Sequence, residues 1–102
     1  MTTTLDQLLS DYRDKNGGSY QLWRRAHDSM PGGNTRTGVH VDPFPIYTER
    51  GEGVHVTDVD GNERTDFVCN ATALILGHAH PDVVSALQSR AAMGTAFFGP
   101  TP

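Results

Sequence analysis

The chain has 102 residues, with eight Lys and Arg against twelve Asp and Glu, and a formal net charge of −4. This length allows one small domain at most, and the acidic balance, with no basic cluster beyond Arg24-Arg25, argues against binding to a nucleic-acid backbone. The single cysteine, Cys69, cannot form an internal disulfide, which favours a reducing compartment. The N-terminus lacks a basic region followed by an apolar run, and no apolar stretch is long enough to cross a bilayer. We therefore expect a soluble cytoplasmic protein with no nucleic-acid or membrane partner.

Two helices are predicted before residue 31. In the first, apolar residues recur at the i, i+3, i+4 and i+7 positions of one helical face: Leu5, Leu8, Leu9 and Tyr12. Gly17 and Gly18 are expected to end this helix, and Ser19 is expected to cap a second one. The second helix has one aromatic and apolar face: Tyr20, Trp23, His27 and Met30. Pro31–Gly33 is expected to end it and to open a loop that runs to about Pro43.

Short segments with β-branched or aromatic residues follow and predict three strands. Their apolar residues fall into three groups: Phe44 and Ile46; Val54, Val56 and Val59; Phe67 and Val68. Arg50–Gly53 and Asp60–Asn62 are the expected turns, and Asp60-Gly61 is a strong hairpin signal because both residues tolerate a positive φ. The pattern predicts a three-stranded antiparallel meander, which needs an apolar cover over one face to be stable.

A last helix is predicted to begin at Pro81, because a helix does not need the missing N–H in its first turn. Asp82 complements the helix dipole there, and Gly94 is expected to end the helix. Its expected buried stripe consists of apolar residues: Val83, Val84, Leu87 and Ala91. Beyond it, Phe97 and Phe98 look like the start of a loop that belongs to a larger structure. The predicted fold class is α+β.

Two motifs that suggest a metal site have a simpler structural interpretation. Asp58–Asn62 looks like the start of a calcium loop, but the sixth and twelfth positions hold Glu63 and Cys69 instead of Gly and Glu, so a hairpin turn is favoured. His78 and His80 could bind a metal, but no further clustered donor accompanies them. We expect His78 to pack in a turn and His80 to cap the following helix, and we predict no metal-binding residue.

The segment Pro31–Arg36 is the strongest candidate for a ligand site. Its glycines allow close backbone approach, Asn34 and Thr35 offer short polar contacts, and the guanidinium of Arg36 suits a carboxylate or a phosphate. The segment lacks the spacing of a P-loop or a dinucleotide-binding motif, and the residues alone favour a Gly-rich linker over an anion site. No set of catalytic residues can be assigned from spacing.

Several short pieces of the chain, in order and at matching spacing, resemble a known enzyme family. They are Met30–Asn34, Pro45–Gly53, Val56–Glu63, Ile75–Val84 and Gly94-Thr95. Over residues 31–102 the sequence is similar to the N-terminal part of class III, fold-type-I pyridoxal-phosphate enzymes, in the branch of glutamate-1-semialdehyde 2,1-aminomutase and related aminotransferases.

The resemblance implies a homodimeric enzyme that uses pyridoxal 5′-phosphate to transfer an amino group from a carboxylated amine to a keto acid or an aldehyde. In the family, the lysine, the aspartate and the phosphate-binding residues that hold the cofactor all come later than position 102. We therefore expect an N-terminal fragment that is inactive alone and has no catalytic or cofactor-binding residue. Residues 1–30 would form leader helices, and residues 31–102 would begin the small domain and the loop into the missing large domain.

The resemblance also implies three substrate-binding residues. Arg36 matches an arginine that binds the substrate carboxylate, Thr35 replaces the serine before it, and Ala71 falls where many relatives carry an aromatic residue that faces the substrate. The loop is shorter than that of the aminomutase proper, which favours an aminotransferase, with glutamate-1-semialdehyde 2,1-aminomutase as the alternative. A truncated, non-catalytic interaction module is a further alternative.

Overall fold

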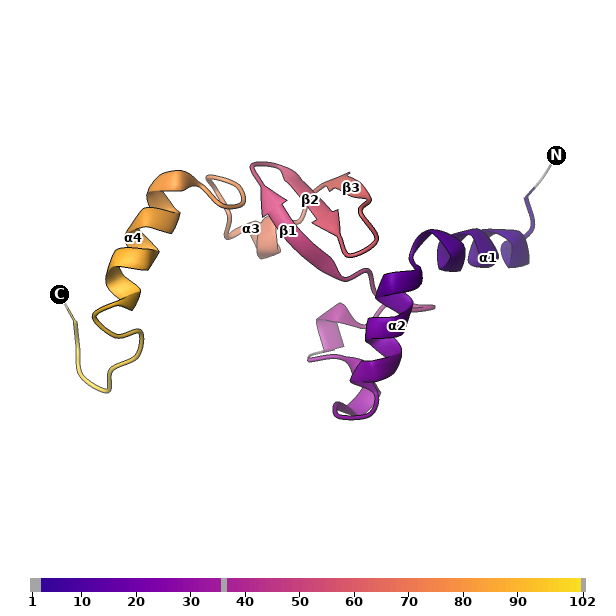
Figure 1. Ribbon diagram of the computed structural model, residues 1–102, viewed down its shortest axis with the longest axis horizontal. Coiled ribbons are helices and arrows are strands. Elements are labelled where there is room, and N and C mark those ends of the chain that lie inside the picture. The colour runs from indigo at the N-terminus through magenta and orange to yellow at the C-terminus, as the bar shows by residue number, and fades with distance from the viewer. Residues whose placement is uncertain (1–2, 36, 102) are drawn as a thin grey trace.

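The computed structural model describes residues 3–35 and 37–101, which form an extended α+β arrangement. The elements in chain order are α1 (Leu5–Lys15), α2 (Gly17–Ala26), η1 (Pro31–Gly33), η2 (Thr37–Val39), β1 (Thr48–Glu52), β2 (His55–Asp58), β3 (Glu63–Thr65), α3 (Cys69–Thr72) and α4 (Pro81–Ala91). The sheet lies between α1 and α2 at one end and α3 and α4 at the other, with the termini at opposite ends (Figure 1). The α+β prediction is confirmed.

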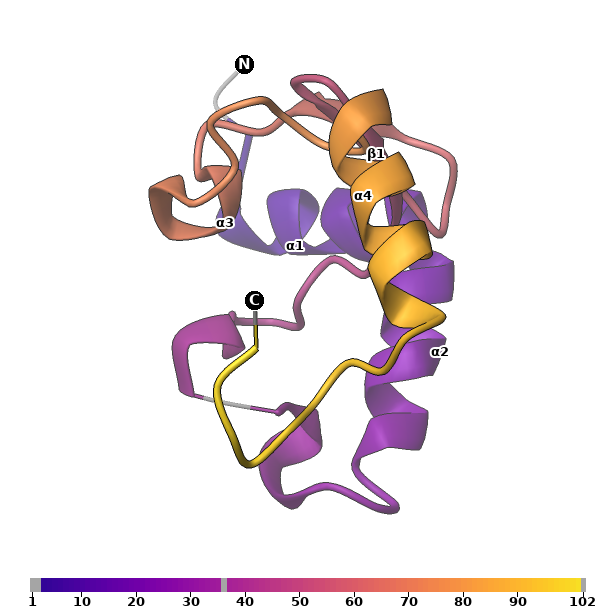
Figure 2. The same ribbon diagram turned by 90° about the vertical axis from the view of Figure 1, so that its left-hand side faces the viewer.

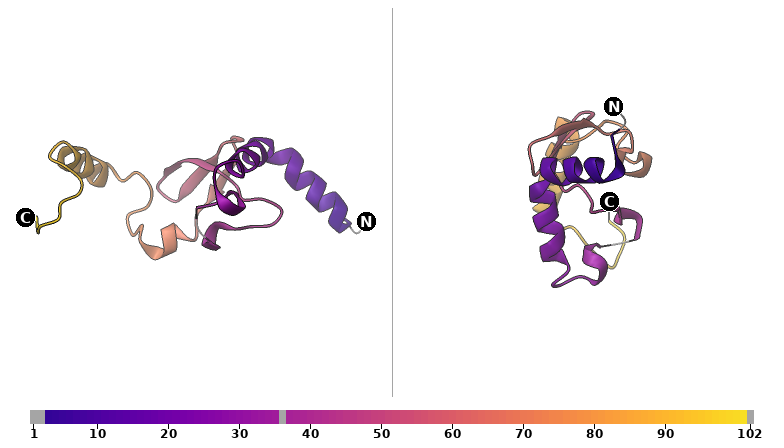
Figure 3. Two further views of the ribbon diagram at one scale, coloured as in Figure 1. Left: turned by 90° about the horizontal axis from the view of Figure 1, so that it is seen from below. Right: turned by 90° about the vertical axis from the view of Figure 1, so that its right-hand side faces the viewer.

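The molecule is much longer than it is wide. Its extents are 60 × 31 × 20 Å and its radius of gyration is 17.7 Å, whereas a compact domain of this length has a radius of gyration of about 13 Å. Seen along the long axis, α4 lies in front of the sheet (Figure 2), and the view from below shows α1 and α4 projecting in opposite directions (Figure 3). None of the described helices is both long and apolar enough to cross a membrane.

The junction of α1 and α2 differs from the sequence-based expectation. Gly17 and Gly18 do not end a helix; they begin α2. Ser19 does not cap α2 but is buried in its first turn, where its Oγ accepts the backbone N–H of Tyr47 at 3.0 Å. The cap comes from the hairpin instead, because the carboxylate of Asp60 accepts the N–H groups of Gly18 at 2.5 Å and Ser19 at 3.0 Å. A charged acceptor at a helix N-terminus satisfies these donors and complements the helix dipole.

A small aromatic cluster around Phe44 is the main core of the described chain. Phe44 is only 1% exposed. The centroid of its ring lies 5.0 Å from that of Tyr12, 5.3 Å from that of Tyr20 and 6.2 Å from that of Trp23. The Tyr12 hydroxyl donates to the carbonyl of Phe44 at 2.8 Å. The predicted aromatic face of α2 is therefore confirmed for Tyr20 and Trp23. The helix ends at Ala26, so Met30 lies beyond it.

The predicted antiparallel meander is confirmed, with strand order β1-β2-β3, but the strand boundaries are shifted. β1 occupies residues predicted to be a turn, and the real turn is Gly53-Val54, where Gly53 has a φ of +55°. Phe44 precedes β1 and packs in the core, while β3 ends at Thr65, before Phe67. The Asp60-Gly61 hairpin turn is confirmed, with Gly61 at a φ of +83°.

The apolar faces of the outer helices have no partner among the described residues. The stripe of α1 is exposed at Leu5, Leu8 and Leu9, and the predicted burial of the α4 stripe is wrong, because α4 has no buried residue. Phe67 is 91% exposed, and Phe98 is fully exposed. Amphipathic helices gain most of their stability by burying such faces, and the described residues leave these faces uncovered.

Candidate functional site

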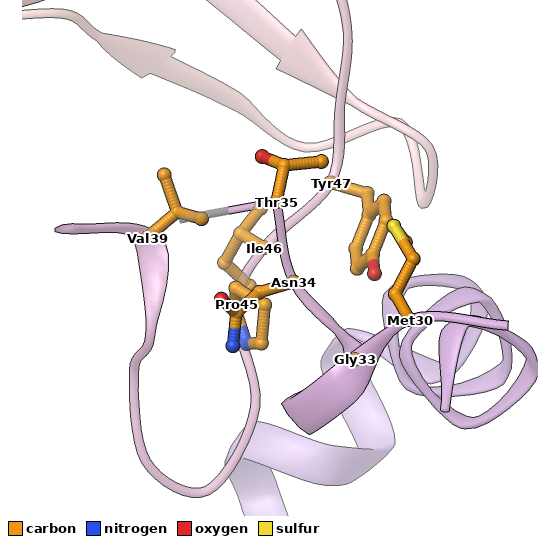
Figure 4. Close-up of a pocket in the computed structure, with 8 residues that line it drawn as sticks. All are labelled: Met30, Gly33, Asn34, Thr35, Val39, Pro45, Ile46 and Tyr47. Carbon is orange, nitrogen blue, oxygen red and sulfur yellow. The ribbon is translucent and has the colours of Figure 1, made fainter. Parts of the chain in front are cut away.

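A hollow of about 170 Å³ lies beside the glycine-rich loop that was predicted as a possible anion site. Its wall comes from the end of the α2 region, η1, η2 and the segment before β1, with Met30 and Tyr47 on one side and Val39 on the other (Figure 4). Asn34 and Thr35 line the same hollow. The hollow therefore combines a mainly apolar wall with the amide of Asn34 and two residues that carry a hydroxyl group, Thr35 and Tyr47.

Two glycines shape this loop. Gly32 and Gly33 have φ values of +69° and +66°, in the left-handed region that glycine adopts without steric cost. Gly33 is also buried, and a Cβ atom there would overlap the ring of His27. His27 Nδ1 lies 2.9 Å from the carbonyl oxygen of Trp23. This hydrogen bond fixes the orientation of the imidazole, against which Gly33 packs. The contact with His27 thus fixes the position of Gly33 relative to the end of α2.

The structure places two of the three predicted substrate-binding residues in different parts of the fold. Thr35 is exposed at the rim of the hollow. Ala71 lies in α3 and does not line that hollow. Arg36 lies outside the described residues. Within the described chain the predicted site residues are therefore not gathered into one pocket.

Ala71 sits in a left-handed turn. Cys69, Asn70, Ala71 and Thr72 have φ values between +48° and +69°, and the turn is closed by a bond from the N–H of Thr72 to the carbonyl of Val68 at 3.0 Å. A left-handed turn costs roughly 1–2 kcal/mol for each residue with a Cβ atom. Such strain persists only where the surrounding structure determines the conformation.

Asp66 and His78, at the two ends of the segment that contains this turn, form a close pair. His78 Nε2 lies 2.7 Å from Asp66 Oδ2, with both side chains partly buried. The hydrogen bond from His78 lowers the pKa of Asp66, with help from the N–H groups of Cys69 and Val68. Instead of lying in a turn as expected, His78 forms an isolated β-bridge with Gly53. His80 occupies the cap position of α4 but makes no side-chain capping bond, so that expectation is wrong.

Asp66 had no role in the sequence-based interpretation. A short polar residue before two backbone N–H groups is the only local signal for it, and it is typical of many turns. Its pairing with His78, twelve residues later, depends on how the sheet brings the two positions together. Within residues 3–35 and 37–101, no three His, Cys, Asp or Glu side chains lie close enough to share a metal ion.

Comparison with known proteins supports the predicted resemblance. The family model for class-III aminotransferases matches residues 37–99. The chain is 44% identical over 87 residues to a glutamate-1-semialdehyde 2,1-aminomutase of Methylacidiphilum infernorum, covering 82% of this chain and 20% of that protein. It is 54% identical over 63 residues to an uncharacterized aminotransferase of Schizosaccharomyces pombe, covering 62% of this chain and 14% of that protein.

A solved structure shows the same fold. A transaminase with PLP bound superimposes with a TM-score of 0.80 at 50% identity, covering 85% of this chain and 20% of that one. The chain thus spans about a fifth of the length of the relatives it matches. Its helices and three-stranded sheet correspond to part of a transaminase fold. With the family model matched over residues 37–99, this chain belongs to the class-III aminotransferase family.

Proposed function

We propose that this chain forms the N-terminal part of a PLP-dependent aminotransferase, which moves an amino group from a carboxylated amine to a keto acid or an aldehyde. The observation that carries the proposal is the 50% identity to a PLP-bound transaminase over 85% of the chain. The unpartnered apolar faces of α1 and α4 support it, because a larger structure would cover them. The 102 residues alone are proposed to be inactive.

We propose that this chain does not hold the cofactor by itself. When bound, PLP draws electrons away from the carbon that carries the amino group. Lys15 is the only lysine of the chain and lies exposed at the end of α1. The hollow beside the loop is smaller than the roughly 300–1,000 Å³ of typical small-molecule pockets, and its wall is mainly apolar. The cofactor and its lysine would therefore be held by residues outside this sequence, and this chain would contribute to substrate binding.

We assign Arg36 to the substrate carboxylate. A guanidinium can bind a carboxylate through two parallel hydrogen bonds, which fixes its orientation as well as its charge. The loop supports this role because Gly33, three residues before Arg36, packs closely against the ring of His27. This contact anchors the loop that carries Arg36. Thr35 would offer its hydroxyl to the same group. Ala71 would face the side chain of the substrate and leave room for a large one.

Substitution of Arg36 in the full-length enzyme tests this assignment. We expect Arg36→Ala to raise KM for acidic substrates, with an effect on kcat/KM of about tenfold or more, since a charged hydrogen bond contributes roughly 1.5–3 kcal/mol. Arg36→Lys keeps the charge but loses the planar fork and is expected to recover only part of the loss. Arg24→Ala, which removes an exposed arginine of α2, serves as the control. Unchanged kcat/KM in Arg36→Ala would remove Arg36 from the site.

An aminotransferase is favoured over an aminomutase. In support, the chain is 54% identical over 63 residues to an uncharacterized aminotransferase and 50% identical over 85% of its length to a transaminase, against 44% over 87 residues to an aminomutase. To test this, the gene is sequenced beyond codon 102, and the full-length product is purified, loaded with PLP and assayed with an amine donor and a keto acid. We expect amino transfer that depends on the added keto acid. Movement of the amino group between adjacent carbons of one substrate, without an added keto acid, would identify the aminomutase.

Two further outcomes of that experiment would contradict the proposal as a whole. One is a reading frame that ends at codon 102 and a stable 102-residue product, which would favour an interaction module. The other is a full-length product that binds PLP but transfers no amino group.

We also propose that the complete enzyme is a cytoplasmic homodimer acting on small molecules, with no nucleic-acid or membrane partner. Sedimentation of the full-length product as a monomer would contradict the dimer.

A further inference from the structure

The segment from Asp66 to His78 is a loop whose two ends are tied to the same turn of the sheet. At one end, the N–H of Asp66 donates to the carbonyl of Val54 at 2.8 Å. At the other, the N–H of His78 donates to the carbonyl of Gly53 at 2.8 Å, and the N–H of Gly53 donates back to the carbonyl of His78 at 2.9 Å. The segment therefore has the closed neck of a compact surface loop, a type that frequently carries function.

The side chains of Asp66 and His78 close the same neck a second time. Oδ2 of Asp66 lies 2.7 Å from Nε2 of His78, while Oδ1 accepts the N–H groups of Val68 at 2.8 Å and Cys69 at 3.0 Å. The Asp66 carboxylate thus links the two ends of the loop through Oδ2 and bonds the N–H groups at the start of the left-handed turn through Oδ1. The ring of His78 also lies on the backbone of β1, where a Cβ atom at Gly51 would come within 2.6 Å of it.

The turn that this carboxylate begins is the strained part of the loop. Its four residues, Cys69–Thr72, all have a Cβ atom and a positive φ, and a conformation of that kind must be held by its surroundings. The Asp66 carboxylate bonds the N–H of Cys69, the first of the four residues, and is itself fixed by His78. Ala71 stands in the middle of the turn.

We infer that Asp66 and His78 are positioning residues that hold the left-handed turn in place and so determine which substrate side chains fit beside Ala71. This inference rests on the proposed function. A fixed turn keeps the small side chain of Ala71 at a constant distance from the substrate and preserves space for amines with a large side chain. When the pair is broken, the neck keeps its backbone bonds, but the carboxylate that fixes the first residue of the turn is no longer held by the ring of His78.

The test compares three variants of the full-length enzyme. His78→Ala removes the ring, whereas His78→Gln retains an N–H donor near the position of Nε2. His55→Ala is the matched control, because His55 lies next to the neck, opposite Thr65, but its side chain pairs with Glu63 at 3.7 Å and not with Asp66. Two quantities are measured: amide hydrogen exchange over residues 66–78 without substrate, and the ratio of kcat/KM for a bulky amine to kcat/KM for a small one.

We expect faster exchange over residues 66–78 in His78→Ala and a change of about tenfold in the ratio, since small displacements in an active site have effects of this size. His78→Gln should recover both quantities, and His55→Ala should leave both unchanged. If His78→Ala does not fold, Asp66→Asn replaces it, because the amide keeps an oxygen for the backbone N–H groups.

Each remaining outcome overturns a definite part of the inference. Unchanged exchange in His78→Ala would show that the pair does not hold the loop. Faster exchange with an unchanged substrate ratio would show that the loop is held but does not set specificity. Failure of the proposed function is a different result, namely no amino transfer by the unsubstituted enzyme, and the exchange measurement remains decisive for the pair in that case.

Discussion

Asp58 is the buried charge that joins the sheet to the helices, and its titration is expected to control stability at acid pH. The carboxylate is 2% exposed. It accepts the N–H groups of Asp60 at 3.0 Å and Asn62 at 2.8 Å and forms an ion pair with Arg64. Arg64 in turn donates to Asn16 Oδ1 at 3.2 Å, next to the start of α2. Neutralising Asp58 therefore weakens both the hairpin turn and its contact with the helices.

The size of the effect follows from the pKa of this group. Burial raises the pKa of Asp58, but the hydrogen bonds from Arg64 and Asn62 outweigh burial and lower it from the ordinary value of 3.8 to about 2. Because the folded-state pKa is the lower one, the stabilisation is present above pH 4–5 and is lost as the pH falls toward 2. A shift of this size corresponds to about 2 kcal/mol of unfolding free energy.

Trp23 provides the assay, since it is the only tryptophan and packs against His27 and Phe44. Urea unfolding of the chain is followed by its fluorescence at low protein concentration, near neutral pH and at acid pH. We expect Asp58→Asn to lose about 2 kcal/mol near neutral pH and to show a weaker pH dependence than the unsubstituted chain. Asp14→Asn, at an exposed site on α1, is the control. The same pH dependence in Asp58→Asn and in the unsubstituted chain would refute the reasoning.

Four further substitutions test the local structure, each by urea unfolding followed by circular dichroism. The added Cβ atom of Gly17→Ala meets no atom within 4 Å, so this substitution should stabilise α2 by about 0.5–1 kcal/mol. The Cβ atom of Gly18→Ala would lie 2.8 Å from Asp60 Oδ1, so this substitution should destabilise α2. Equal effects of the two substitutions would contradict the Asp60 cap. Gly77→Ala, at a φ of +79° and with a Cβ atom 2.6 Å from a backbone oxygen, should cost about 1–3 kcal/mol or more, and a neutral result would contradict the neck of the loop. Thr4→Ala removes the capping box of α1 and should cost about 1 kcal/mol; unchanged helicity would contradict the cap.

The elements with strong local signals could be predicted from the sequence. Pro81 and Asp82 mark the start of α4, and Asp60-Gly61 marks a hairpin, because each depends on the conformation of one or two residues. The order of the sheet followed from that hairpin. The aromatic face of α2 was predictable from its helical spacing.

The remaining features depend on contacts between distant positions. The first hairpin turn lies at Gly53 because the backbone of His78 pairs with it, and Ser19 is buried because Asp60, about forty residues later, replaces it as the cap. The pairing of Asp66 with His78 and the left-handed turn between them arise in the same way. Of the candidate site, the sequence pointed to the glycine-rich loop but could not show that Thr35 and Ala71 lie in separate parts of this chain.

The exposed apolar helices have another cause. The stripes of α1 and α4 have the spacing of buried faces, yet no described residue covers them. Sequence spacing shows that a helix has an apolar face, but not which protein segment packs against it.

The most direct test of the account is the compactness of the isolated 102-residue chain in solution, measured by small-angle X-ray scattering together with binding of a hydrophobic dye. We expect dye binding and either self-association or an extended monomer with a radius of gyration near 17.7 Å. A dye-free, compact monomer with a radius of gyration of about 13 Å would contradict the claim that these helices and this sheet are built to pack against further protein.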